Sequence, residues 1–214
     1  MNKIQMVLSL PLTLLCAHHA AGQEQRPNIV YIMSDDHSAQ AVSAYGGILS
    51  KVMSTPNIDR IGREGIRMDR CCVTNSISAP SRGCILTGQY SQLNGIYTLN
   101  DGLLPEQDNF AKELQRSGYQ TAVVGKWHLK NEPAGFDYYN VMPDQGRYFN
   151  PRLISAEDRR GQTCPFDRTK ATVYEGHSTD VITDQVLGWL DRRDPGKPFM
   201  VMCHYKAPHR SWEY

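Results

Sequence analysis

The sequence has no excess of charge of either sign. Its 214 residues include 23 lysines and arginines against 22 aspartates and glutamates, a formal net charge of +1. Binding to nucleic acid through a broad basic face needs clustered positive charge, so this balance argues against a nucleic-acid partner. Aromatic residues make up only 9% and charged residues 21% of the chain. That composition is typical of a folded globular protein and argues against extended disorder.

The sequence also lacks a hydrophobic run long enough to span a membrane. Its longest, MVLSLPLTLLCA at residues 6–17, is interrupted by a proline and preceded by Lys3. A basic start, a short apolar stretch and small residues near position 22 indicate a secretory signal peptide at residues 1–22. The bulky leucine before Cys16 argues against a surface lipoprotein. We therefore expect an exported protein whose residues 23–214 belong to one domain.

No cysteine spacing in the chain matches a zinc site. Five cysteines follow Cys16, so at least one of these five lacks a partner among them, although export permits disulfides. Cys84 and Cys203 lie in apolar surroundings in the sequence, and we interpret them as small buried residues.

Short apolar runs alternate with helical patterns along the rest of the chain. Strands are expected at 28–34, 120–125 and 197–205, and helices at 55–66, 108–118 and 178–193. This alternation predicts an α/β fold with a largely parallel sheet. Residues 131–176 show little periodicity and are expected to form a long excursion facing the substrate.

Two of these helices carry specific expectations. In the first, Thr55 is the expected N-cap, and Ile58, Ile61 and Ile66 are expected to share one apolar face. In the last, Ser178 or Thr179 is the expected cap.

Polar residues of catalytic type follow the expected strands. In open α/β sheets, sites form beyond the carboxyl ends of the strands, so these residues are candidates for one site. The candidates are Asp35 and Asp36 after the first strand, Lys126 and His128 after the second, His204 and His209 at or after the third, and Ser78 and Arg82 at the start of a further helix.

The residue types indicate a particular chemistry. Adjacent carboxylates suit a hard divalent cation, whereas their ordinary alternative is a solvated turn. Ser78 at a helix start is either a hydroxyl nucleophile or a plain N-cap. Lys126 can bind an anion and His128 can act as a base, although a solvated lysine and a structural histidine are common. Taken together, these groups suit transfer of an anionic sulfuryl or phosphoryl group.

The motifs themselves resemble those of the sulfatase family. The stretch SAPSR followed by LTG resembles the family signature, in which a cysteine or serine opens the element. PNIVYIMSDD, TPNIDRIGREGI and VVGKWHL resemble further family blocks in the same order. The resemblance implies an alkaline phosphatase-like α/β sandwich, incomplete here, with residues 23–214 as the N-terminal part of its catalytic domain.

The resemblance also implies a cofactor and a modified residue. Ser78 would be oxidised to formylglycine by a radical maturation enzyme, which is typical of serine-type bacterial sulfatases and points to the periplasm. Asp35, Asp36 and the modified Ser78 would bind Ca²⁺. The hydrated aldehyde carries two hydroxyls, of which one attacks sulfur and the other lets the carbon release sulfate.

The remaining roles are also implied by the resemblance. Arg82 would steady the formylglycine, Lys126 would hold the sulfate, and His128 would be the base for elimination. His209 would contact the sulfate and assist the leaving oxygen, whereas His204 has no family role and is interpreted as structural.

The substrate implied is a sulfated glycan, such as 6-sulfated N-acetylglucosamine of mucin or glycosaminoglycans. Further calcium ligands and a second sulfate-binding lysine are expected beyond Tyr214, so residues 23–214 alone are expected to have little activity. Two other functions stay open: a metal-dependent phosphatase or phosphodiesterase with Ser78 as direct nucleophile, and an inactive truncated remnant.

Overall fold

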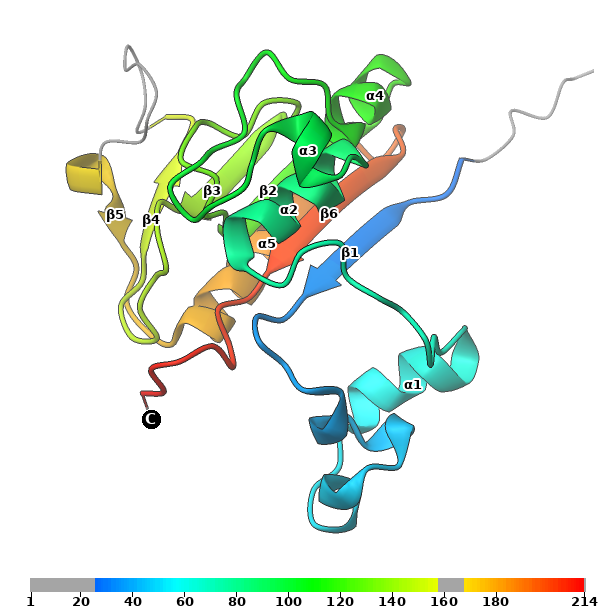
Figure 1. Cartoon of the computed structure of the whole chain (residues 1–214). Coiled ribbons are helices and arrows are strands. Elements are labelled where there is room, and N and C mark those ends of the chain that lie inside the picture. Colours follow the sequence, from blue (N-terminus) through cyan, green and yellow to red (C-terminus); the bar gives the residue numbers. More distant parts are fainter. Residues whose placement is uncertain (1–25, 158–167, 214) are drawn as a thin grey trace, which may run out of the picture.

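The computed structural model, which describes residues 26–157 and 168–213, is built on a six-stranded sheet (Figure 1). The expected signal peptide at 1–22 lies outside the described residues. The strands are β1 Ile29–Met33, β2 Gln120–Lys126, β3 Tyr138–Met142, β4 Arg152–Ser155, β5 Thr172–Val173 and β6 Phe199–His204. Their order across the sheet is β1-β6-β2-β3-β4-β5, in which β1, β6, β2 and β3 are parallel, β4 is antiparallel to β3, and β5 is antiparallel to β4.

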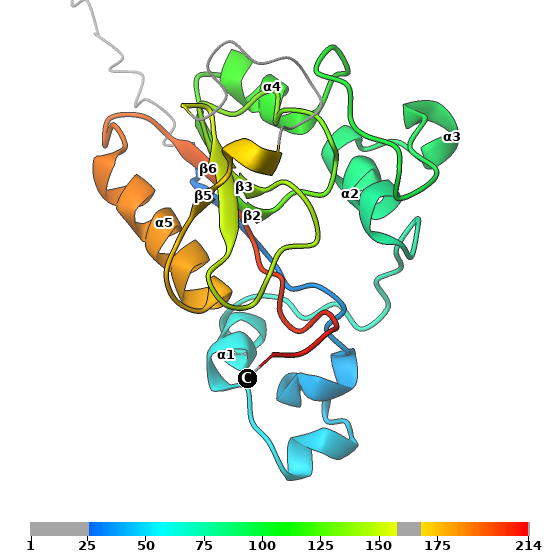
Figure 2. The ribbon, with the colours of Figure 1, turned by 90° about the vertical axis from the view of Figure 1, so that its left-hand side faces the viewer.

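Helices α2 Ser78–Thr87, α4 Phe110–Arg116 and α5 Ser178–Arg192 cover the two faces of this sheet, and the short α3 Ser91–Asn94 follows α2. Helix α1 Pro56–Glu64 lies apart from the sheet beside the 3-10 turns Ala39–Ala41, Ser43–Tyr45 and Ile48–Lys51, and a further 3-10 turn is at Arg168–Lys170 (Figure 1). Figure 2 shows α5 on one face and α2 and α4 on the other. Across the described part of the chain, no helix has the length and apolar content needed to cross a membrane.

Each face of the sheet has its own apolar core. On one face, Val123 and Met202 pack with Leu86 of α2 and Ala111 of α4. On the other, Val124 and the remaining inward residues of β2 and β6 pack against α5. The predicted α/β fold with a largely parallel sheet is therefore confirmed, and the three predicted strands are its adjacent members β1, β6 and β2.

The segment 131–176 differs from the expected excursion because it adds β3, β4 and β5 to the sheet. The strand β3 was missed because Asn140 interrupts its apolar run. Asn140 is nevertheless buried in the sheet, where its amide donates to Tyr174 (2.9 Å) and Gln185 (3.0 Å). These bonds meet the cost of burying the amide nitrogen, so a polar residue is tolerated in a core strand.

Helix ends show a further difference. The predicted caps of α5 were Ser178 and Thr179, but the N-cap is His177, whose Nδ1 accepts from the backbone N–H of Thr179 at 3.3 Å. Thr55 is the N-cap position of α1 as predicted, yet its hydroxyl makes no capping bond and donates to Asp59 at 2.8 Å.

The apolar face of α1 is not buried as the isoleucine spacing predicted. Ile58 is 44% and Ile61 62% exposed, and Ile66 lies beyond the end of the helix at Glu64. The helix is held instead by polar contacts, in which Asp59 accepts from the backbone N–H of Ala44 at 2.9 Å. The cysteine interpretation is confirmed for Cys84 and Cys203, which are both buried thiols.

Candidate active site

Three neighbouring parallel strands end at one edge of the sheet and place residues of the site there. Asp35 follows the end of β1 by two residues, Lys126 is the last residue of β2, and His204 is the last residue of β6. Because β6 lies between β1 and β2, the carboxyl ends of all three meet there. Gly125 allows this close approach: it has φ +100°, and a Cβ there would lie 2.0 Å from the carbonyl oxygen of His204.

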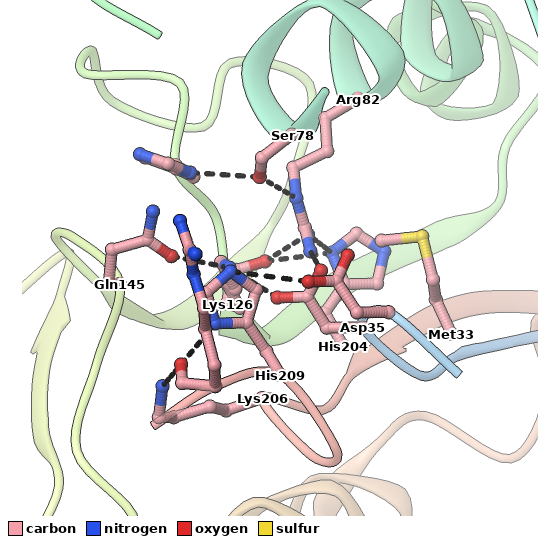
Figure 3. Close-up of polar contacts among 12 residues, drawn as sticks. Met33, Asp35, Ser78, Arg82, Lys126, Gln145, His204, Lys206 and His209 are labelled. Atoms are coloured by element: carbon pink, nitrogen blue, oxygen red, sulfur yellow. Dashed lines mark hydrogen bonds and ion pairs between the residues drawn. The ribbon is translucent and has the colours of Figure 1, made fainter. Parts of the chain in front are cut away.

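Ser78 is the first residue of α2, and its hydroxyl faces the strand ends (Figure 3). The N-cap of this helix is Ile77, which has no capping side chain, so Ser78 is not an ordinary N-cap. Its Oγ lies 2.8 Å from His128 Nδ1 and accepts from Arg82 Nε at 3.1 Å. The serine hydroxyl is therefore held between an imidazole and a guanidinium.

Arg82 links Ser78 to Lys126 at the end of β2 and to Asp35 just after β1. Its guanidinium is buried, donates from Nη1 to the carbonyl oxygen of Lys126 at 2.6 Å, and lies 3.8 Å from a carboxylate oxygen of Asp35. Burial lowers the pKa of Arg82 to about 10, with Asp35 acting in the opposite direction. The side chain is thus still a cation at neutral pH.

Lys126 has no exposed surface, yet it carries an ammonium group. The ammonium donates to Asp35 and, at 2.7 Å, to the side-chain oxygen of Gln145. Burial is the main cause that lowers its pKa, and the bond to Asp35 opposes this. The carboxylate of Asp35 is therefore shared by two cations, Lys126 and Arg82.

His128 is held as a neutral imidazole. It has φ +57°, is 4% exposed, and its pKa is lowered to about 4, first by burial and then by Lys126 and Arg82. At neutral pH, one ring nitrogen therefore keeps a lone pair that can take a proton.

His209 joins the site through the turn that follows β6. Its Nε2 lies 3.5 Å from a carboxylate oxygen of Asp36, and the backbone N–H of Asp35 donates to the carbonyl of Ala207 in the same turn at 3.1 Å. The structure thus brings together the seven residues to which the resemblance assigns roles, Asp35, Asp36, Ser78, Arg82, Lys126, His128 and His209. Figure 3 shows five of them, Asp35, Ser78, Arg82, Lys126 and His209, around one centre.

His204, interpreted from the sequence as structural, contacts two residues of this group. It is buried, its Nδ1 lies 3.1 Å from the Lys126 carbonyl and 3.3 Å from Arg82 Nη1, and its Nε2 has no hydrogen-bond partner. Burial, then Arg82, lowers its pKa to about 3, so it is neutral beside the guanidinium.

Three further residues near the site were not predicted from the sequence. Gln145 bonds Lys126, and Tyr148 donates its hydroxyl to the backbone carbonyl of His209 at 2.5 Å. The ammonium of Lys206 lies 4.9 Å from the centre of the Tyr148 ring. Their only sequence signal was that 131–176 was expected to face the substrate and that Lys206 lies close to His204 and His209.

The donor chemistry suits a hard cation. Asp35 and Asp36 offer adjacent carboxylates, and Ser78 lies within the same group. Calcium takes about six to eight oxygen ligands, so these residues would be part of a larger set. Within 26–157 and 168–213, no three His, Cys, Asp or Glu side chains converge on one point.

Comparison with known proteins gives a consistent result. The sulfatase family model matches residues 27–214. An N-acetylglucosamine-6-O-sulfatase of Bacteroides thetaiotaomicron is 44% identical over 212 residues, covering 96% of this chain and 35% of that protein. The human N-acetylgalactosamine-6-sulfatase is 32% identical over 216 residues, covering 89% of this chain and 41% of that protein.

A solved structure is also similar. It is described as a complex with its substrate D-glucosamine-2-N,6-O-disulfate, and it superposes with a TM-score of 0.79 at 45% identity, covering 88% of this chain and 36% of that one. The chain therefore spans roughly a third of the length of these bacterial relatives. Its sheet and helices correspond to the N-terminal part of the alkaline phosphatase-like fold, and the chain belongs to the sulfatase family.

Proposed function

We propose that the protein hydrolyses sulfate esters of sulfated glycans, such as 6-sulfated N-acetylglucosamine. The observation that carries this proposal is the Ser78 hydroxyl held between His128 at 2.8 Å and Arg82 at 3.1 Å, beside the buried Lys126. The choice of sugar is supported by the relative named for N-acetylglucosamine 6-O-sulfate and by the neighbour bound to a 6-O-sulfated glucosamine.

The cations of the site would bind the sulfuryl group. Lys126 and Arg82 are both buried and share the carboxylate of Asp35, so neither cation is paired with a carboxylate of its own and both can attract an incoming anion. Charge that builds up on the sulfuryl oxygens is stabilised strongly by such fixed, desolvated donors. His209, beside Asp36, would donate to the sulfate or to the leaving oxygen.

Proton transfer falls to His128. Its neutral imidazole already contacts Ser78 Oγ, so it can take a proton from a hydroxyl at this position. Oxidised to formylglycine and hydrated, residue 78 would supply one hydroxyl to attack sulfur and a second to release sulfate. Asp35 and Asp36 would hold a calcium ion, whose charge would polarise the sulfuryl oxygens.

The rival phosphatase chemistry would use Ser78 directly as nucleophile. Many such enzymes bind the transferred group with two metal ions about 4 Å apart. Here Arg82 contacts the serine and Lys126 lies beside Arg82, and these two cationic groups favour a sulfuryl group bound mainly by protein. The proposal extends to maturation and location: export to the periplasm by residues 1–22, and modification of the SAPSR stretch by a radical enzyme.

The deciding measurement is the accurate mass of the peptide containing Ser78, from full-length gene product purified from its native host. Conversion of serine to formylglycine removes two hydrogens, a loss of about 2 Da. That loss, located at Ser78 by fragmentation and accompanied by sulfate release from 6-sulfated N-acetylglucosamine, is the expected result. Active protein with an unmodified serine would overturn the formylglycine mechanism and favour the phosphatase.

A further inference from the structure

The connection between β3 and β4 contacts Lys126 and Lys206 through two uncharged side chains, Gln145 and Tyr148, and it also carries Asp144, whose charge acts on His128. Gln145 accepts a hydrogen bond from the Lys126 ammonium at 2.7 Å, and Figure 3 shows its amide directed at that ammonium. Tyr148, three residues later, places its ring against Lys206 and donates its hydroxyl to the backbone of His209. The amide and the aromatic face each contact an ammonium group without adding negative charge.

The charge balance explains why an uncharged partner matters for Lys126. A buried ammonium needs acceptors for its three N–H groups, because each unmet bond costs free energy. Asp35 supplies one acceptor but is shared with Arg82, so Lys126 has no carboxylate to itself. A carboxylate at position 145 would satisfy the ammonium equally well, but it would add a negative charge directly at the group that is to bind an anion.

The geometry leaves one donor for a ligand. Asp35 and Gln145 take two of the three ammonium hydrogens of Lys126, and no other acceptor among the described residues bonds the third. With two bonds fixed, the direction of the third is fixed as well. The ammonium is therefore oriented before an anion arrives, which lowers the entropy cost of binding it.

We propose that Gln145 is a positioning residue, whose amide oxygen orients Lys126 and, being uncharged, keeps its positive charge available for the sulfuryl group of the substrate. This inference rests on the proposed function. It separates two properties of the side chain, its ability to accept a hydrogen bond and its lack of charge, and two substitutions test them independently.

Gln145→Glu keeps the shape and the acceptor but adds a charge, whereas Gln145→Met keeps the length and removes the acceptor. The readouts are kcat and KM for 6-sulfated N-acetylglucosamine, the inhibition constant of inorganic sulfate, and the urea midpoint of unfolding, all on the full-length gene product. Gln145→Glu is expected to weaken sulfate inhibition and raise KM by about tenfold or more, because a like charge adjoins the anion, while its urea midpoint is not lowered. Gln145→Met is expected to lower kcat/KM by about tenfold with a smaller effect on sulfate inhibition.

If Gln145 served only as a hydrogen-bond acceptor, Gln145→Glu would stay closer to the unchanged protein in sulfate inhibition than Gln145→Met, because glutamate also accepts the bond and methionine does not. Sulfate inhibition of Gln145→Glu equal to that of the unchanged protein would overturn the inference. Gln89→Glu is the matched control, since Gln89 is exposed just past the other end of α2, and it is expected to retain unchanged constants. If the unchanged protein neither releases sulfate nor is inhibited by it, the proposed function itself fails, and that result is distinct from a variant without effect.

Discussion

Replacing Arg82 with lysine separates the charge of this side chain from its shape. The guanidinium donates from Nε to Ser78 at 3.1 Å and from Nη1 to the Lys126 carbonyl at 2.6 Å, while Nη2 lies 3.8 Å from Asp35. A lysine ammonium keeps the positive charge but is a single point, and it cannot reach the three partners that a planar fork spans.

The expected magnitude follows from the bonds that are lost. Hydrogen bonds from a charged donor contribute about 1.5–3 kcal/mol each, so losing two costs about 3 kcal/mol or more. If most of this cost falls on the transition state, kcat/KM decreases about 100-fold, because each factor of ten corresponds to about 1.4 kcal/mol. Sulfate released from 6-sulfated N-acetylglucosamine, measured by ion chromatography, reports kcat/KM, and urea unfolding reports the share that falls on stability.

Arg63→Lys is the matched control, because the Arg63 side chain on α1 is 68% exposed and outside the site. It is expected to leave both measurements unchanged. An Arg82→Lys enzyme within threefold of the unchanged protein in kcat/KM, with the same urea midpoint, would refute the view that the fork geometry matters.

Three further predictions concern single side chains. The pKa of His204 is lowered to about 3 in the folded protein, below the usual value of about 6.5, so the unfolded chain takes up this proton first and stability is lost as pH falls below about 6.5. The urea midpoint of His204→Phe should therefore decline less steeply between pH 7 and 4 than that of the unchanged protein. Equal slopes would contradict this. Asn109→Ala removes the N-cap bond to Lys112 (3.1 Å) and should lower the free energy of unfolding by about 1 kcal/mol in urea titration, whereas an unchanged value would rule the cap out. Ser78→Ala should abolish sulfate release with an unchanged circular dichroism spectrum, and retained activity would show that Ser78 is not the nucleophile or its precursor.

The central strands were predictable because they are buried on both faces. Every residue of β6 and all but the first of β2 are buried, and such strands appear in a sequence as continuous apolar runs. The strand β3 contains Asn140, whose bonds to Tyr174 and Gln185 exist only once the fold is formed. Nothing local in the sequence could indicate that the nitrogen of this amide finds acceptors.

The site was predictable in part for a related reason. Parallel strands end at a common edge, so residues after separate strands were expected to converge, and the contact between Arg82 and Lys126 across 44 positions agrees with this. The contribution of Gln145 was not predictable, because its segment has no periodicity that places it against β2. For α1 the sequence predicted too much burial, because a periodic pattern predicts an apolar face but does not show whether another element packs against it, and the isoleucines of this helix are exposed.

The position of β6 between β1 and β2 also has a consequence for biosynthesis. Asn28, just before β1, and Phe199, at the start of β6, lie 171 positions apart. At about 5–20 residues per second, a ribosome makes β6 about 10–30 seconds after β1, and β6 is the one strand among the described residues that pairs with β1. Such distant pairing also slows folding, because a large loop must close first. Asp35 and Lys126 therefore meet late in synthesis, and the nascent chain carries an unpaired apolar strand that a chaperone would have to protect until then.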